Sequence, residues 1–149
     1  HTRSSEVSWL GDVYKRQVMS ELKTPIIVVV TGEGGSGGAL AISVGDHLSM
    51  LQYATYSVAS PEACSSIIWR TPDKASEAAD AMKVCSHELL KINIIDEIIS
   101  EPLGGAHRDY DEVSLQIKHS LIQNLAKLSQ LSSEDLVDRR YKRLLQIGI

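Results

Sequence analysis

The stretch Ile26-Ile-Val-Val-Val-Thr-Gly-Glu-Gly-Gly-Ser-Gly-Gly38 contains the strongest structural signal in the sequence. Its first five residues are apolar and β-branched without interruption, which is typical of a strand buried on both faces in a parallel sheet. From Gly37 the residues are small and mostly apolar as far as Gly45, which predicts a short buried helix. The stretch therefore predicts a strand, a glycine turn and a helix in succession.

Strand and helix signals alternate after this unit. Ser60 is a good helix N-cap residue and stands directly before a proline, which favours a helix start there. We expect strands over His47–Leu51, Tyr56–Ala59 and Ile92–Ile99, and helices over Pro61–Trp69 and from Pro72 to about Ala81. This alternation favours an α/β architecture.

The chain becomes purely helical after Glu101–Arg108, which we interpret as a linking turn. Apolar residues then recur at steps of three and four, which predicts a long helix with one apolar face. They are Val113, Ile117, Leu121, Leu125 and Leu128. A last helix is predicted from about Ser132, with a basic cluster that we interpret as a solvated helix end. The cluster consists of Arg139, Arg140, Lys142 and Arg143.

Composition and charge restrict the functional classes. The chain has 149 residues, of which 43% are hydrophobic and 23% charged, as in globular proteins. A net charge of -4 argues against nucleic-acid binding, which requires a basic face. The longest apolar run, Ile26–Val30, is far shorter than the ~18 residues of a membrane span. Cys64 and Cys85 lack the spacing of a zinc site, so we predict two buried free thiols and no metal.

The chain divides into three parts by sequence character. Residues 1–17 show neither periodicity nor capping signals, and we interpret them as an unmatched or non-native leader without structure. Residues 18–108 form the α/β core portion, and residues 109–149 form a helical C-terminal extension.

The glycine turn matches two nucleotide-binding patterns only in part. Gly32, Gly34 and Gly37 satisfy GxGxxG between a strand and a helix, but no carboxylate follows about 20 residues later to bind a ribose. A P-loop requires Lys and then Ser or Thr after the last glycine, where this chain has Gly38 and Ala39.

Three other interpretations of the turn stay open on the residues alone. The pattern GxSxG around Ser36 is that of a hydrolase nucleophile elbow, with Asp96 and either His107 or His119 completing a triad. Alternatively, backbone N–H groups at the helix start form an oxyanion hole, which glycine leaves accessible because it has no Cβ. In the third interpretation the glycines only allow close packing, within a non-catalytic interaction module.

Several stretches resemble the carboxyltransferase alpha subunits of bacterial-type acetyl-CoA carboxylase, which belong to the crotonase-like group. The resemblance covers about residues 18–149 and rests on Val30–Ile42, Met50–Tyr53, Tyr56–Val58, Ser60–Glu62, Glu101–Arg108, Ser133–Leu136 and Arg139–Tyr141. It implies that the chain is a C-terminal fragment. It also implies crotonase-like ββα superhelical turns in the core portion, followed by the helical extension.

The resemblance implies transfer of a carboxyl group from carboxybiotin to acetyl-CoA, which gives malonyl-CoA. In this scheme Gly37 and Gly38 form the oxyanion hole for carboxybiotin, and Gly34, Gly35 and Ser36 shape the substrate-binding loop. No cofactor is bound covalently, because a biotin carboxyl carrier protein presents the carboxybiotin. A carboxyltransferase beta subunit supplies a second glycine pair, so the fragment alone is expected to be inactive.

The resemblance also implies the setting of the enzyme. We expect a hetero-oligomer of two alpha and two beta subunits in an ATP-binding enzyme of fatty acid biosynthesis. Its location would be the cytoplasm, or the plastid stroma for a plant or algal source.

Overall fold

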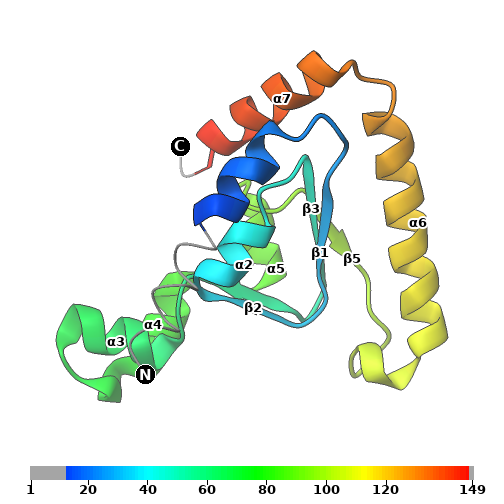
Figure 1. Cartoon of the computed structure of the whole chain (residues 1–149). Coiled ribbons are helices and arrows are strands. Elements are labelled where there is room, and N and C mark those ends of the chain that lie inside the picture. Colours follow the sequence, from blue (N-terminus) through cyan, green and yellow to red (C-terminus); the bar gives the residue numbers. More distant parts are fainter. Residues whose placement is uncertain (1–12, 148–149) are drawn as a thin grey trace, which may run out of the picture.

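Two small parallel sheets form the centre of the molecule. The computed structural model describes residues 13–147 (Figure 1). One sheet has the strand order β1-β3-β5, and the other pairs β2 with β4. The strands are β1 (Ile27–Val30), β2 (Glu33–Gly35), β3 (His47–Leu51), β4 (Thr55–Ser57) and β5 (Glu97–Ile99). The α/β class predicted from the sequence is confirmed.

Helices flank these sheets. They are α2 (Ser36–Ile42), α3 (Pro61–Trp69), α4 (Ala75–Met82), α5 (Ser86–Lys91), α6 (Tyr110–Leu128) and α7 (Ser133–Leu145), with the 3-10 turns η1 (Pro72–Lys74) and η2 (Ala106–Arg108). Residues 13–21 are also helical. In Figure 1, α6 and α7 run along the outside of the sheets, and α3 and α4 project from the body. The predicted helical character after residue 108 is confirmed.

The strands belong to two consecutive ββα units. The first contains β1, β2 and α2, and the second contains β3, β4 and α3. Val28 pairs with Leu48 in one sheet, and Gly34 pairs with Tyr56 in the other. Both pairings are parallel, because two units stacked in the same orientation place equivalent strands side by side.

The burial predicted for the first strand is wrong. Every residue of β1 is half-buried, because β1 lies at the edge of the three-stranded sheet. The central strand β3 has a neighbour on each side and is buried from Leu48 to Leu51. An apolar run reports the composition of a strand but not how many neighbours cover it.

The strand predicted over Ile92–Ile99 is also largely wrong, since only its last part, β5, is a strand. Helix α5 precedes it and was not predicted. Ile95 is 2% exposed although it lies outside any strand. Its apolar side chain fills the core from a turn, which the sequence pattern does not distinguish from a strand.

Helix starts agree better with their sequence signals. Ser60 Oγ accepts the N–H of Ala63 at 3.2 Å and caps α3, as predicted. Helix α2 begins at Ser36 instead of Gly37 and ends before the predicted Gly45. The helix predicted from Pro72 is divided into η1 and α4.

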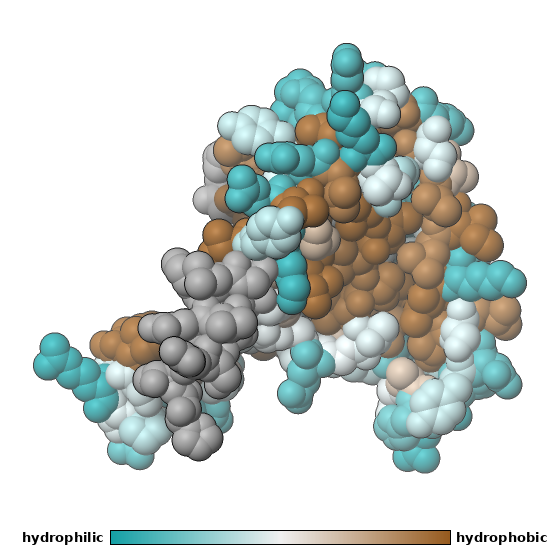
Figure 2. Space-filling model, in the orientation of Figure 1, coloured by the Kyte–Doolittle hydropathy of each residue, from teal (hydrophilic) through white to brown (hydrophobic). Residues whose placement is uncertain are grey.

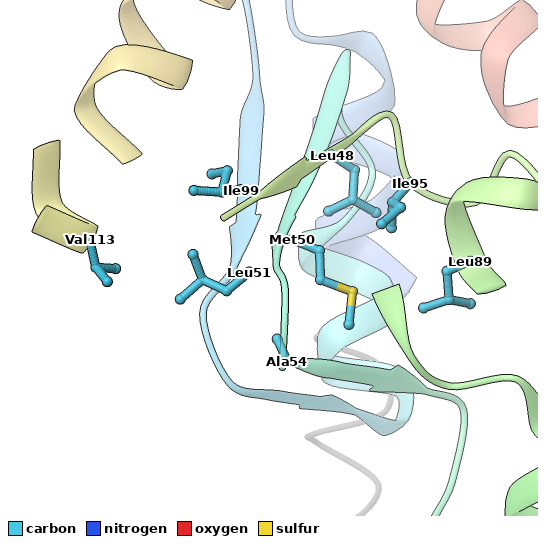
Figure 3. Packing of buried hydrophobic residues seen from close by; sticks show 8 residues of the cluster. All are labelled: Leu48, Met50, Leu51, Ala54, Leu89, Ile95, Ile99 and Val113. Carbon is cyan, nitrogen blue, oxygen red and sulfur yellow. The ribbon is translucent and has the colours of Figure 1, made fainter. Parts of the chain in front are cut away.

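The hydrophobic core joins the three-stranded sheet to α5 and α6 (Figure 3). Met50 and Leu51 of the central strand are almost completely buried. The other members of the cluster are Leu48, Ala54, Leu89, Ile95, Ile99 and Val113. On α6, the predicted apolar face is buried or half-buried except at Leu125, which is exposed.

The basic cluster of α7 was predicted to be a solvated helix end, and this prediction is wrong. Arg140 is fully buried and donates to the fully buried Asp46, with Nε–Oδ1 and Nη2–Oδ2 distances of 3.0 and 2.8 Å. Its remaining N–H groups donate to the carbonyls of Met19, Leu22 and Thr24. We call these five residues the arginine clamp. The clamp satisfies all five donors of the guanidinium, and so binds α7 to the first helix.

The absence of structure predicted for residues 1–17 is wrong for residues 13–17, which belong to the helix of residues 13–21. Residues 1–12 lie outside the described residues. The last carbonyls of a helix have no partner inside it. Here a distant arginine satisfies Met19 from 121 positions further along the chain, so no local capping signal was needed.

A polar cluster around Glu97 holds α6 on the sheet. Glu97 Oε2 accepts from Ser120 Oγ at 2.6 Å, Ser49 Oγ at 2.9 Å and Asn124 Nδ2 at 3.0 Å. It also lies 3.1 Å from His47 Nε2. Burial acts to raise the pKa of Glu97, but hydrogen bonds from Ser120, His47 and Ser49 outweigh it and lower the pKa.

The two cysteines are free thiols, as predicted, but the burial predicted for them is wrong. Cys64 is half-buried and Cys85 is exposed, at the N-cap of α5. Among residues 13–147, no helix combines the length and the apolar character that crossing a membrane requires.

Candidate functional site

The glycine turn, residues Gly32–Gly38, connects β1 to α2. Gly34 and Gly35 lie in β2, while Gly37 and Gly38 lie in the first turn of α2. The change from strand to helix occurs at Ser36, whose φ is +66°. A positive φ is unfavourable for a residue with a side chain, and such strain occurs often at functional sites.

The glycines of the turn serve different purposes. A Cβ at Gly34 would lie 2.8 Å from Cδ2 of Tyr56 and 3.3 Å from Cγ1 of Val30. A Cβ at Gly38 would meet nothing within 4 Å. Gly34 is therefore required by packing between β2 and β4, whereas packing does not explain Gly38.

The first turn of α2 presents backbone donors. The helix begins at Ser36, so the N–H groups of Ser36, Gly37 and Gly38 have no acceptor within the helix. The N-cap residue Gly35 offers no side-chain cap, and no acidic residue lies in the first turn. Gly37 is exposed and Gly38 half-buried. Donors arranged in this way suit an oxygen on which negative charge develops.

A mostly apolar cavity of about 320 Å³ lies beside the turn, and we call it the turn cavity. Ser36 and Leu40 line it from α2, while Leu144 and Ile147 line it from the C-terminal end of the described chain. Gly37 and Gly38 themselves do not line it. Its other residues are Ser43, Val44, Leu48, Tyr56, Ser57, Val58, Met82, Leu89, Ile94 and Arg143. Cavities of this size and character hold small ligands.

Arg143 holds the end of α7 over the turn cavity. Its Nη2 lies 2.7 Å from Oδ2 of Asp96 and 3.2 Å from the carbonyl oxygen of Ile94. Asp96 also accepts the N–H of Leu48 at 2.7 Å. Arg139 Nη1 likewise donates to the carbonyl oxygen of Asp46, at 2.8 Å. Arg139, Arg140 and Arg143 thus all make tertiary bonds, contrary to the prediction of a solvated end.

The structure does not assemble the hydrolase triad predicted around Ser36. Ser36 lines the turn cavity, but His107 and His119 line two other cavities. Asp96 is paired with Arg143. The positive φ of Ser36 is a feature of a nucleophile elbow, yet a serine without a base is not activated. The hydrolase interpretation is therefore wrong.

The loop Glu101–Arg108 is a turn, as predicted. The carboxylate of Glu101 accepts the N–H groups of Tyr53 and Ala106, at 2.6 and 2.7 Å. Gly104 and Gly105 have φ values of +92° and +102°, which favour glycine. Glu101 therefore has a structural role in fixing the loop to the end of β3.

Sequence reasoning missed two hydroxyl groups beside the glycine turn. Tyr56 OH lies 2.6 Å from Ser43 Oγ, and both residues line the turn cavity. No sequence signal joins them, because the contact depends on how β4 packs against α2. Within residues 13–147, no three His, Cys, Asp or Glu side chains gather in a way that would hold a metal ion.

Stacked ββα units and a glycine-rich helix start define an α/β protein in which the first turn of α2 presents backbone donors. A protein-family model described as "Acetyl co-enzyme A carboxylase carboxyltransferase-like" matches residues 14–148. The chain belongs to this family, and the family predicted from sequence resemblance is confirmed.

Three relatives illustrate the match, each named acetyl-coenzyme A carboxylase carboxyl transferase subunit alpha. The chain is 56% identical to that of Photorhabdus laumondii over 130 residues, which are 87% of the chain and 41% of the relative. It is 57% identical to that of Vibrio campbellii over 132 residues, which are 89% and 41%. It is 51% identical to that of Pseudomonas entomophila over 147 residues, which are 99% and 45%. The chain thus spans about two-fifths of the length of these relatives.

Proposed function

We propose that this chain is part of a carboxyltransferase alpha subunit that transfers the carboxyl group of carboxybiotin to acetyl-CoA. The product is malonyl-CoA, which begins fatty acid synthesis. The observation that carries the proposal is the first turn of α2, where Gly37 and Gly38 present N–H groups without an acceptor in the helix. Membership of the family supports it.

The glycine N–H groups act on the carboxyl donor. When the bond between N1′ of biotin and the carboxyl carbon breaks, negative charge develops on the ureido oxygen. Fixed N–H dipoles stabilise this charge without gaining or losing a proton. The carboxyl carbon then bonds to the methyl carbon of acetyl-CoA, and the proton lost by the methyl group ends on N1′ of biotin.

Partner proteins complete this scheme. Charge develops on the ureido oxygen and also on the thioester oxygen, and the glycine turn serves only the first. A carboxyltransferase beta subunit provides the second glycine pair, in an assembly of two alpha and two beta subunits. A biotin carboxyl carrier protein presents the carboxybiotin, so this chain needs no covalently bound cofactor. The ββα units continue as a crotonase-like superhelix, and the enzyme works in the cytoplasm.

The test is carboxyl transfer by a chimera. Residues 14–148 replace the matching segment of the Photorhabdus laumondii relative, and the chimera is assembled with the beta subunit of the same organism. With carboxylated carrier protein and acetyl-CoA, we expect malonyl-CoA from the assembly and none from the 149-residue chain alone. A folded, assembled chimera without activity would contradict the proposal. Turnover by the chain alone would contradict the division of the site between two subunits.

A further inference from the structure

Tyr56 and Ser43 form a fixed hydroxyl pair in the wall of the turn cavity. Their hydroxyl oxygens lie 2.6 Å apart, and both residues line the turn cavity, which Ser36 also lines. Ser43 is only 8% exposed. The ring of Tyr56 packs over Gly34, where a Cβ would lie 2.8 Å from its Cδ2. Neither side chain is free to turn away.

The hydrogen bonds decide which oxygen keeps a free lone pair. Ser43 Oγ lies 3.0 Å from the carbonyl oxygen of Leu40, which only accepts. A serine hydroxyl has one hydrogen, and this bond uses it. The short contact with Tyr56 then requires the tyrosine hydroxyl to donate to Ser43. Tyr56 therefore offers the cavity an acceptor and no hydrogen.

The rest of the cavity wall suits an uncharged ring system. Most of its side chains are apolar, and its one cationic side chain, Arg143, is engaged by Asp96 and by the carbonyl of Ile94. The acceptor at Tyr56 lies in a mostly apolar wall and matches a ligand that is largely apolar and carries an N–H or O–H donor. The ring system of biotin is neutral and largely apolar, and it keeps one ureido N–H after N1′ is carboxylated.

We propose that Tyr56 accepts a hydrogen bond from the remaining ureido N–H of the carboxyl donor and so sets the orientation of its ring. Tyr56 is thereby a specificity-determining residue, and Ser43 is a positioning residue that acts through Tyr56. The inference rests on the proposed function, because that function supplies the cyclic urea. It adds a side-chain contact to a site that otherwise uses backbone donors.

The experiment compares two ligands on the 149-residue chain by ligand-observed NMR titration. One is biotin, and the other is the cyclic carbamate in which oxygen replaces the N–H at the ring position opposite N1′. We expect the wild type to bind biotin about tenfold more tightly than the carbamate, the effect of one hydrogen bond. Tyr56→Phe keeps the ring over Gly34 but removes the acceptor, so the preference should shrink to within about twofold.

Two further variants make the test specific. Tyr53→Phe removes a hydroxyl from a different cavity and should keep the tenfold preference. Ser43→Ala frees the hydrogen of Tyr56, which can then donate to the ring oxygen of the carbamate, so the preference should shrink or reverse. A full preference in Tyr56→Phe overturns the inference and leaves the proposed function standing. If the wild type does not bind biotin, or Gly37→Val binds it unchanged, the proposed function fails and the inference fails with it.

Discussion

The arginine clamp and the glycine turn lie in one small chain and use opposite chemistry. The clamp contains a buried charge pair, Arg140 and Asp46, and every donor of the guanidinium is satisfied by an acceptor in this chain. The turn has backbone N–H groups at Gly37 and Gly38 that the helix leaves without acceptors. A satisfied buried network stabilises a fold, whereas preorganised free donors are available to a ligand.

This difference separates stability from activity. A substitution in the clamp should lower the stability of the fold and does not test the chemistry of the glycine turn. A substitution in the helical half of the turn should change the chemistry with little effect on folding. The strand half of the turn lies between these cases, because Gly34 is packed against Tyr56.

The largest effect on stability is expected for Arg140→Met. The change leaves the Asp46 carboxylate buried with the N–H of Ile26 but without its cationic partner, and it leaves several carbonyls unsatisfied. It should lower the free energy of unfolding by about 3–5 kcal/mol. Urea denaturation of the chain measures it. Lys142→Met is the matched control on the same helix, because Lys142 and Asp138 form an exposed pair and its loss should leave the midpoint unchanged. Equal midpoints for the two variants would show that the clamp does not stabilise the fold.

A smaller effect is expected from Gly34→Ala. The new Cβ would clash with the Tyr56 ring, and such overpacking should cost about 1–3 kcal/mol of unfolding free energy. Gly38→Ala introduces the same atom into open space within a helix, so it should be neutral or stabilising by up to about 1 kcal/mol. Thermal unfolding of both variants measures the difference. A loss of stability in Gly38→Ala equal to that in Gly34→Ala would remove the distinction between the two halves of the turn.

The smallest effect is the pH dependence carried by Glu97. Its pKa is lowered in the folded chain, so its contribution to stability is present above the unfolded pKa and is lost as the pH falls through the folded one. We expect Glu97→Gln to be less stable than the wild type at neutral pH. The difference in free energy of unfolding between the two proteins should become smaller in acid. Denaturation midpoints over the acid range test this, with the exposed Glu77→Gln as control. A gap that stays constant with pH would show that ionisation of Glu97 does not matter.

The sequence predicted local features well. The glycine turn, the cap at Ser60 and the helical C-terminal part each depend on neighbouring residues, and each is confirmed. Features that depend on distant residues were missed. The clamp joins residues 94 positions apart, and the half-burial of β1 depends on which strands lie beside it. A pattern along the chain contains no information about such neighbours.

The candidate site divides in the same way. Its glycines were predicted because their letters and their place between a strand and a helix are visible in the sequence. The Tyr56–Ser43 pair and the cavity wall from α7 were not, because tertiary packing alone brings them to the turn. The assignment of Gly37 and Gly38 to carboxybiotin stays a prediction.

The most direct test of the account compares two substitutions one residue apart. In the assembled chimera, Gly37→Val should cost about 2.7–4 kcal/mol of transition-state stabilisation, roughly 100- to 1000-fold in kcat, because it disturbs a backbone donor. Ser36→Ala removes only a hydroxyl and should leave carboxyl transfer within a few fold. The opposite result, in which Ser36→Ala abolishes transfer and Gly37→Val retains it, would contradict catalysis by the backbone of the glycine turn.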